Sequence, residues 1–287
     1  MKNNSYMSQR KSVVPTRVML IIIWVLIIAV LGYMGYLFFN HAVSIDGKNE
    51  TPSDASGVNS TALVVVYDDS YDKTPPSFTL LNFNESEHKI SVAVIPSNTV
   101  CNTNAGKTTL EKQYAYGGVL QAVDAVNNLC GISVDYYAAI ECQSLQTVTD
   151  IMGAFKYDVP QDMKTKSSNG VIMCDIQKGL QSISAQQLTE YFRFDGWSPS
   201  ERAAQLSKLT AAIINAYSNE QTSAKITSLF GEVASDIETN VSIIQMGDLQ
   251  SEYADYLVLK STAFEVEVSA DGGVIDSKSL KNIADTF

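Results

Sequence analysis

The longest apolar stretch of the chain, VMLIIIWVLIIAVLGYMGYLFF, runs from Val18 to Phe39 and contains no charged residue. At about 1.5 Å per residue, a helix of this length crosses the roughly 30 Å hydrocarbon core of a bilayer. The residues before it carry four basic side chains and no acidic one. A cleavable signal has a shorter apolar core and a small-residue cleavage site. The pattern therefore predicts one uncleaved transmembrane helix, with residues 1–17 in the cytoplasm and the rest of the chain outside the cell.

Residues 40–60 are rich in Ser, Asn, Asp and Gly, which is typical of a flexible linker. Apolar runs of strand length follow. Ala62–Tyr67 is a continuous run that predicts a strand buried on both faces. The runs at 77–83 and 89–95 flank the polar NESEH and predict a hairpin. Further strands are expected at 135–141, at 171–176 on an edge of the sheet, at 256–260 and at 263–268.

Helical periodicity alternates with these strands. Residues 118–129 place four apolar side chains on one stripe and are followed by Gly131, a typical stop. That stripe consists of Leu120, Val123, Val126 and Leu129. Two more amphipathic segments, at 144–152 and 226–237, predict further helices.

Two capping boxes mark the start of two other helices. Ser184 with Gln187 begins one, and Ser198 with Glu201 begins the other, which has Pro199 at its first helical position and extends to about residue 217. Strands that alternate with helices predict an α/β domain over residues 61–287, with a mixed central sheet covered by helices on both faces.

Composition narrows the functional classes. The net charge of −11 and the lack of a basic tract argue against nucleic-acid binding. The four cysteines, widely spaced in the outer domain, allow two disulfides in three pairings or four buried thiols, and the sequence leaves both open. Zinc binding is not expected, because no two cysteines are close and the chain has only two histidines.

The segment EYFRFDGWSPSERAAQL brings two arginines, Arg193 and Arg202, near a helix start. In the first turn of a helix, a cation is mildly unfavourable because of the helix dipole. Arg202 at that position suits a bound anion, and an acidic partner such as Glu201 or Asp195 is the alternative. The acid-rich stretch that begins with Asp68 and Asp69 is either a cation site or a solvated loop.

Three stretches resemble segments of the LytR-CpsA-Psr family, in the order that the family has them: VAVIPSNTV, QYAYGGVLQAVDAVNNLCGISVDYYAAIE and GLQSISAQQLTEYFRF. The resemblance implies an extracytoplasmic domain of Gram-positive bacteria that transfers a polyprenyl-pyrophosphate-linked glycopolymer to peptidoglycan. It also implies an apolar lipid tunnel, arginines that grip the pyrophosphate and carboxylates that hold Mg²⁺. The lipid-pocket candidates are Tyr114, Tyr116 and Tyr137, for which packing in the core or at its rim is the alternative.

The sequence departs from the family pattern at most of the charged positions. The resemblance makes Asp68 or Asp69 the metal candidate, and Arg193 and Arg202 the pyrophosphate candidates. Family acids and arginines elsewhere are replaced by Phe78, Ser97, Phe194 and Pro199, and two family glutamines by Ala203 and Ala204. The loss of one preorganised group that faces the transferring phosphoryl group slows transfer by a factor of about 10²–10³. Several such groups are absent here.

Three functional hypotheses follow. The preferred one is a catalytically degraded homologue that binds a polyprenyl-linked glycopolymer or partners in the cell envelope. The second is an active, Mg²⁺-dependent glycopolymer–peptidoglycan phosphotransferase, in which the retained arginines and Asp68 or Asp69 do the work. The third is a structural surface domain, in which the aromatic side chains only pack.

Overall fold

The computed structural model describes residues 59–71, 74–84, 87–142, 146, 149–150, 152–218, 238–240 and 262–287. The expected transmembrane helix, most of the linker, the helix at 226–237 and the strand at 256–260 lie outside these residues. Within the described part of the chain, no helix has both the length and the hydropathy needed to cross a membrane.

A six-stranded mixed sheet forms the centre of the domain, in the order β11-β6-β1-β2-β3-β12. Strand β1 pairs antiparallel with β2 and parallel with β6, and β12 joins β3 in parallel. The predicted hairpin is confirmed, because β2 and β3 are antiparallel neighbours. The bounds are β1 Asn59–Tyr67, β2 Ser77–Asn84, β3 Lys89–Ile95, β6 Tyr136–Glu141, β11 Glu238–Thr239 and β12 Thr262–Glu265. The last two residues of the expected linker therefore belong to β1.

Four two-stranded units surround this sheet. They are β4 Val100–Thr103 with β5 Gly106–Thr109, β7 Phe155–Val159 with β10 Gly179–Ile183, β8 Met163–Lys166 with β9 Ile172–Ile176, and β13 Ala270–Asp271 with β14 Val274–Ile275. The strand expected at 171–176 exists as β9. It pairs with β8 alone, so it is an edge strand as expected, in a two-stranded unit outside the central sheet.

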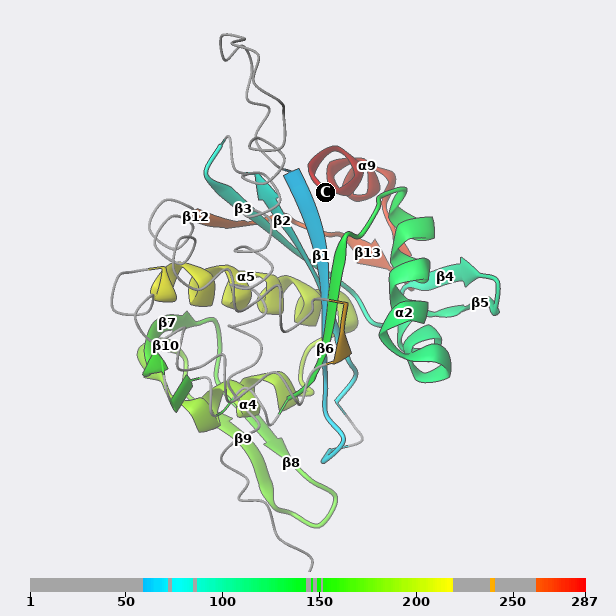
Figure 1. Cartoon of the computed structure of the whole chain (residues 1–287). Coiled ribbons are helices and arrows are strands. Elements are labelled where there is room, and N and C mark those ends of the chain that lie inside the picture. Colours follow the sequence, from blue (N-terminus) through cyan, green and yellow to red (C-terminus); the bar gives the residue numbers. More distant parts are fainter. Residues whose placement is uncertain are drawn as a thin grey trace, which may run out of the picture.

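Helices cover both faces of the sheet, as predicted. Helix α5 (Pro199–Tyr217) lies on one face, and α2 (Leu110–Cys130) and α9 (Ser277–Thr286) lie on the other (Figure 1). Helix α4 (Ala185–Arg193) packs beside α5. Both predicted capping boxes are present, at Ser184 and Ser198. Of the helix expected at 144–152, the described positions are helical, and Gly153 follows with a φ of +96°.

Helix α2 differs from its prediction in two respects. It begins at Leu110 rather than at Gly118, and a kink at Gly117 and Gly118 divides it. The buried face also differs from the predicted stripe, because Val119, Ala122 and Val126 are buried whereas Leu120 is 55% exposed. The predicted stop is confirmed, because Gly131 adopts the left-handed conformation and donates its N–H to the Asn127 carbonyl.

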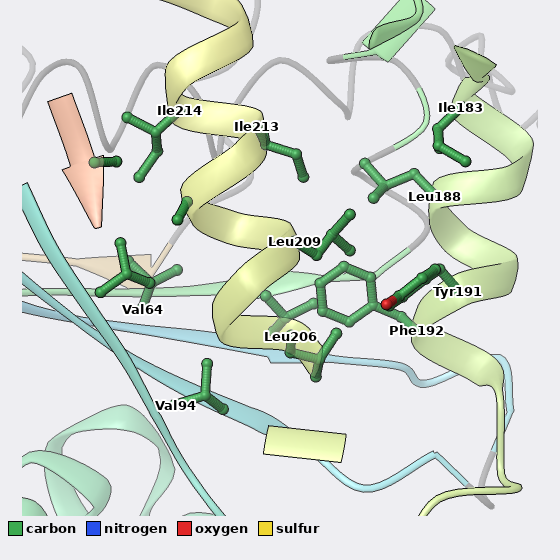
Figure 2. Close-up of a cluster of buried hydrophobic side chains, with 14 of the residues drawn as sticks. Val64, Val94, Ile183, Leu188, Tyr191, Phe192, Leu206, Leu209, Ile213 and Ile214 are labelled. Carbon is green, nitrogen blue, oxygen red and sulfur yellow. The ribbon is translucent and has the colours of Figure 1, made fainter. Parts of the chain in front are cut away.

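Alternate residues of β1 feed two separate cores. Val64 and Val66 point to the face covered by α5, whereas Leu63 and Val65 point to the face covered by α2. The α5-side core combines aliphatic side chains of α5 with Leu188, Tyr191 and Phe192 of α4 (Figure 2). This packing fixes α4, and with it Arg193 at its last position, relative to the end of β1.

Candidate functional site

The carboxyl ends of the parallel strands β1 and β6 meet at one edge of the sheet. Tyr67 is in register with Glu141, and the N–H of Cys142 donates to the Tyr67 carbonyl oxygen. The Ser70 hydroxyl donates to Glu141 Oε1 over 3.2 Å. This is where a ligand site is expected in an α/β fold, because the loops after parallel strands gather polar side chains there.

Arg193 and Asp68, two of the predicted site residues, form an ion pair at this edge. Arg193 Nε donates to Asp68 Oδ2 over 2.7 Å, and Nη2 donates to Oδ1 over 3.3 Å. The Asp68 side chain is fully buried and that of Arg193 is 15% exposed. Burial lowers the pKa of Arg193, but the hydrogen bond and the charge of Asp68 outweigh it, and the net change is a raised pKa. Each candidate therefore neutralises the other in a bidentate pair.

Arg202 occupies a different environment. It is buried, and its Nη2 donates to the carbonyl oxygen of Phe192 over 3.0 Å. Burial lowers its pKa to about 10. No described carboxylate lies within ion-pair distance of it. Neither of the acidic partners considered from the sequence is used, because Glu201 caps α5 and Asp195 accepts from the hydroxyl of Thr165.

An open groove of about 720 Å³ adjoins the ion pair. We call it the tyrosine groove; its lining is Tyr67, Asp68, Asp69, Thr74, Pro75, Pro76, Glu111, Lys112, Tyr114 and Ala115. The rings of Tyr67 and Tyr114 lie 6.1 Å apart, and Tyr114 meets Phe78 edge to face. Burial, followed by the negative charges of Asp69 and of nearby glutamates, raises the pKa of Tyr67. Among the described residues, the lining is therefore aromatic and acidic, with Lys112 as its one cationic side chain.

The remaining pocket candidates lie outside this lining. Tyr116 is 78% exposed next to the kink of α2. Tyr137 is half-buried in β6 and packs against the α2-side core. Of the three tyrosines singled out from the sequence, Tyr114 alone reaches the tyrosine groove.

Four of the positions at which the sequence departs from the family pattern have structural partners. Phe78 is fully buried, and the Ser97 carbonyl accepts the N–H of Glu111 over 2.9 Å. Phe194 packs edge to face on Trp197, and Pro199 occupies the first turn of α5. These side chains complete the core and the helix ends, so they offer no charge to a phosphate.

In its ion pair with Arg193, Asp68 does not fit as a Mg²⁺ ligand. Mg²⁺ requires near-octahedral oxygen ligands, but both oxygens of Asp68 are bound by one guanidinium group. Among the described residues, no three His, Cys, Asp or Glu side chains converge on a point that could hold a metal.

Sequence reasoning missed Tyr67, Glu141 and Glu238 as neighbours of the site. Tyr67 and Glu141 end two strands that are parallel neighbours in the sheet. Both strands were predicted from the sequence, but their pairing was not. Glu238 comes from far along the chain, and a Cβ on Gly118 would lie 3.9 Å from its carboxylate oxygens. No local pattern predicts that contact.

Solved structures share the fold. Bacillus subtilis TagV matches with a TM-score of 0.62 and 20% identity, over 79% of this chain and 95% of that one. The structure of TagT bound to LIIa-WTA matches with a TM-score of 0.57 and 16% identity, over 83% and 92% of the two chains.

Curated relatives are similar in sequence. The polyisoprenyl-teichoic acid–peptidoglycan teichoic acid transferase TagU of Bacillus subtilis strain 168 is 25% identical over 272 residues, which are 87% of this chain and 85% of TagU. The matches to a Staphylococcus aureus protein and to Bacillus licheniformis TagU span 32% and 64% of those relatives. The model of the LytR_cpsA_psr family matches residues 64–284, and the chain belongs to this family.

Proposed function

We propose that this protein is a membrane-anchored, extracytoplasmic LytR-CpsA-Psr protein of a Gram-positive cell envelope whose phosphotransferase chemistry is degraded. In this proposal it binds a polyprenyl-linked glycopolymer, or partners in the envelope, without efficient transfer. The observation that carries the proposal is the ion pair between Asp68 and Arg193. It pairs the retained family acid with the retained family arginine, so that neither is free to bind a ligand.

The charges around the tyrosine groove support weak pyrophosphate binding. Asp69, Glu111 and Glu238 lie at or near the two tyrosine rings, and Lys112 is the one cation among the described residues of the lining. At an effective dielectric constant of about 20, two unit charges 5 Å apart interact by about 3 kcal/mol. Each uncompensated carboxylate therefore opposes a pyrophosphate by up to this amount. Freeing Arg193 to grip an anion would leave the buried Asp68 carboxylate without its partner, at a further cost of about 3–5 kcal/mol.

The alternative is an active phosphotransferase. It is favoured by the names of the relatives, several of which are teichoic acid transferases, and by the retention of Arg193 at the edge of the sheet. In that case an incoming pyrophosphate with Mg²⁺ would displace Asp68 from Arg193, and both groups would then contact the ligand.

Titration with a short-chain polyprenyl pyrophosphate separates the two functions. The full-length protein in mild detergent is titrated with and without Mg²⁺, as wild type, Arg193→Ala and Arg193→Lys. Lys164→Ala is the matched control, because Lys164 is an exposed cation paired with Asp175 away from the groove. The degraded homologue binds with an affinity that changes less than about twofold with Mg²⁺ or with either Arg193 variant, and it transfers no glycopolymer to peptidoglycan.

Binding that requires Mg²⁺, falls at least tenfold in Arg193→Ala and is accompanied by transfer would establish the active enzyme instead. Absence of any binding to polyprenyl pyrophosphate, glycopolymer or envelope proteins would leave a structural surface domain. Circular dichroism of each variant establishes that the fold is intact before the affinities are compared.

A further inference from the structure

The hairpin of β8 and β9 ends in an exposed tip that lies outside the tyrosine groove. Figure 1 shows the hairpin projecting from the domain at the end where β1 finishes, opposite to the start of β1. One face of the hairpin packs in the α5-side core through Met163, Cys174 and Ile176. At the tip, by contrast, Val171 is 56% exposed and Ile172 is 60% exposed. The tip therefore places two adjacent apolar side chains in water.

The backbone of this tip is held by its own hydrogen bonds. The N–H of Ser167 donates to the Val171 carbonyl oxygen over 2.8 Å, and the N–H of Val171 donates to the Ser167 hydroxyl over 3.1 Å. The N–H of Gly170 donates to the Ser167 carbonyl oxygen over 3.0 Å, and Gly170 has φ +83°, which glycine adopts without strain. Backbone groups that are satisfied internally can leave bulk water at little cost, and a preformed loop loses little entropy on docking.

The hairpin carries more positive than negative charge, in a chain of net charge −11. Residues 163–174 contain Lys164 and Lys166 and no acidic residue. Lys164 lies 3.7 Å from Asp175 in an exposed pair, which contributes little because water screens it. Lys166 forms no ion pair with any described residue, and it lies opposite Ile172 in the hairpin register. Cationic and apolar side chains therefore share this end of the hairpin.

This combination is typical of a loop that docks on an anionic lipid surface. Apolar side chains enter the boundary between headgroups and acyl chains, and the lysines beside them face the anionic headgroups. Interfaces between proteins are instead enriched in aromatic residues, Met and Arg and depleted in Lys. The tip from Lys166 to Ile172 contains no aromatic residue, Met or Arg. Its charge and composition therefore favour an anionic membrane over a protein partner.

The chain before β1 is long enough to allow this docking. The 19 residues between Phe39 and Asn59 span at most about 65 Å. A domain of about 230 residues is roughly 45 Å across, so a linker of that length can lead around it from a membrane anchor. An anchor in the same bilayer makes docking of the hairpin intramolecular, and weak contacts are then sufficient.

We propose that the tip of the β8–β9 hairpin docks on the anionic lipid surface of the membrane that holds the protein. Val171 and Ile172 enter the interface, and Lys164 and Lys166 contact the headgroup phosphates. This inference rests on the membrane anchor of the proposed function, but it does not depend on whether the protein binds or transfers a pyrophosphate-linked polymer.

Docking of the tip also sets the distance between the bilayer and Arg193. The hairpin is hydrogen-bonded on both sides of that residue. The N–H of Asp175 donates to Glu190 Oε2 over 3.3 Å, and the Thr165 hydroxyl donates to Asp195 Oδ1 over 2.7 Å. A docked tip therefore holds this edge of the domain next to the membrane, where any lipid-linked ligand is found.

Fluorescence of the full-length protein in lipid nanodiscs tests the docking. The environment-sensitive fluorophore NBD is attached to Val171→Cys or, as a control, to Val274→Cys, since Val274 is 66% exposed in β14. Wild type carried through the same labelling gives the background of the four buried thiols. The discs contain phosphatidylcholine alone or with an equal part of phosphatidylglycerol. The label at position 171 is expected to brighten, and to be quenched by nitroxide lipids, in the anionic discs only, whereas the label at position 274 does neither.

Neutralising the lysines tests the contribution of charge. In the Val171→Cys background, Lys164→Gln/Lys166→Gln is expected to lower the ratio of docked to undocked protein about 30-fold. Lys278→Gln/Lys281→Gln, at exposed positions of α9, removes the same charge elsewhere and is expected to leave that ratio unchanged.

The other outcomes overturn the proposal. Equal signals in the two kinds of disc, or unchanged docking in Lys164→Gln/Lys166→Gln, would show that the tip does not recognise anionic lipid. A signal that rises with protein concentration in detergent without lipid would assign the tip to a second copy of the chain. A label that stays dim on protein incorporated in discs overturns this inference alone, whereas failure of the protein to enter discs contradicts the anchor and this inference together.

Discussion

At the scale of single residues, the pair of Asp68 and Arg193 joins β1 to α4 across 125 positions of sequence. A buried charge without its partner is expensive, whereas an intact buried pair contributes little net stability. Removing one member of the pair is therefore expected to lower the stability of the fold more than the intact pair raises it. Its functional consequence is that an anion must compete with an internal carboxylate for Arg193.

A double-mutant cycle tests this coupling. Arg193→Ala leaves the Asp68 carboxylate unpaired and is expected to lower the free energy of unfolding by about 3 kcal/mol. Asp68→Asn in the Arg193→Ala background removes the stranded charge, so the double variant is expected to recover about 1–2 kcal/mol. Urea unfolding of the four proteins measures both values. Strictly additive losses would show that the two side chains are not coupled.

The buried Arg202 gives a second residue-scale prediction. Its guanidinium group binds one backbone carbonyl, and burial lowers its pKa to about 10, so its charge is poorly compensated. Arg202→Met keeps most of the volume without a buried charge and is expected to change stability by less than about 1 kcal/mol. Arg202→Ala creates a cavity and is expected to cost about 3 kcal/mol. Thermal unfolding of both variants measures the difference, and equal losses would contradict it.

At the scale of elements, the kink of α2 depends on the backbone conformation of Gly118. Gly118 has φ +66° and ψ −157°, a conformation that residues with a Cβ scarcely adopt, although a Cβ would have room there. Gly118→Ala is therefore expected to destabilise the protein by about 1–3 kcal/mol through the backbone alone. Leu120→Ala, on the exposed side of the same helix, is the control and is expected to cost less than about 0.5 kcal/mol. Chemical denaturation that finds the two variants equal would contradict this role of Gly118.

The same kink shows where sequence reasoning about elements succeeds and fails. Local signals such as the capping boxes at Ser184 and Ser198 predicted their helices correctly, because a cap is made by residues three apart. The Gly117–Gly118 pair was read as a helix entry, whereas the chain is helical on both sides of it. That error followed from a tertiary arrangement, since the side chains of Gln113 and Gln121 meet around the bend.

The candidate site was predictable in its parts but not in its pairing. The sequence indicated Asp68 as the acid after the first strand, and Arg193 at the end of a helix. Their contact depends on how α4 packs in the α5-side core, which no local pattern encodes (Figure 2). For Arg202 the local pattern misled. Its place in the first turn of a helix suggested that it binds an anion, but its guanidinium group donates to a buried backbone carbonyl instead.

At the scale of the whole molecule, the two cores on opposite faces of the sheet divide the cysteines between them. Cys101 and Cys130 belong to the α2-side core, and Cys142 and Cys174 belong to the α5-side core. All four are buried free thiols in the structure. A disulfide between the two cores would have to pass through the sheet. Of the three pairings that the sequence allowed, this leaves Cys101 with Cys130 and Cys142 with Cys174, beside the alternative of four buried thiols.

This arrangement predicts the behaviour of the thiols in solution. Burial raises the pKa of Cys101 to about 11, so at pH 8 about one thiol in a thousand is ionised, and the thiolate is the reactive form. The native full-length protein is therefore expected to react with a thiol reagent at pH 8 far more slowly than the unfolded chain. In denaturant without reductant, four thiols per chain should react, because unfolding restores ordinary pKa values and access. Two or no reactive thiols under those conditions would instead establish one or two disulfides, and the stability of each core would then include a covalent contribution.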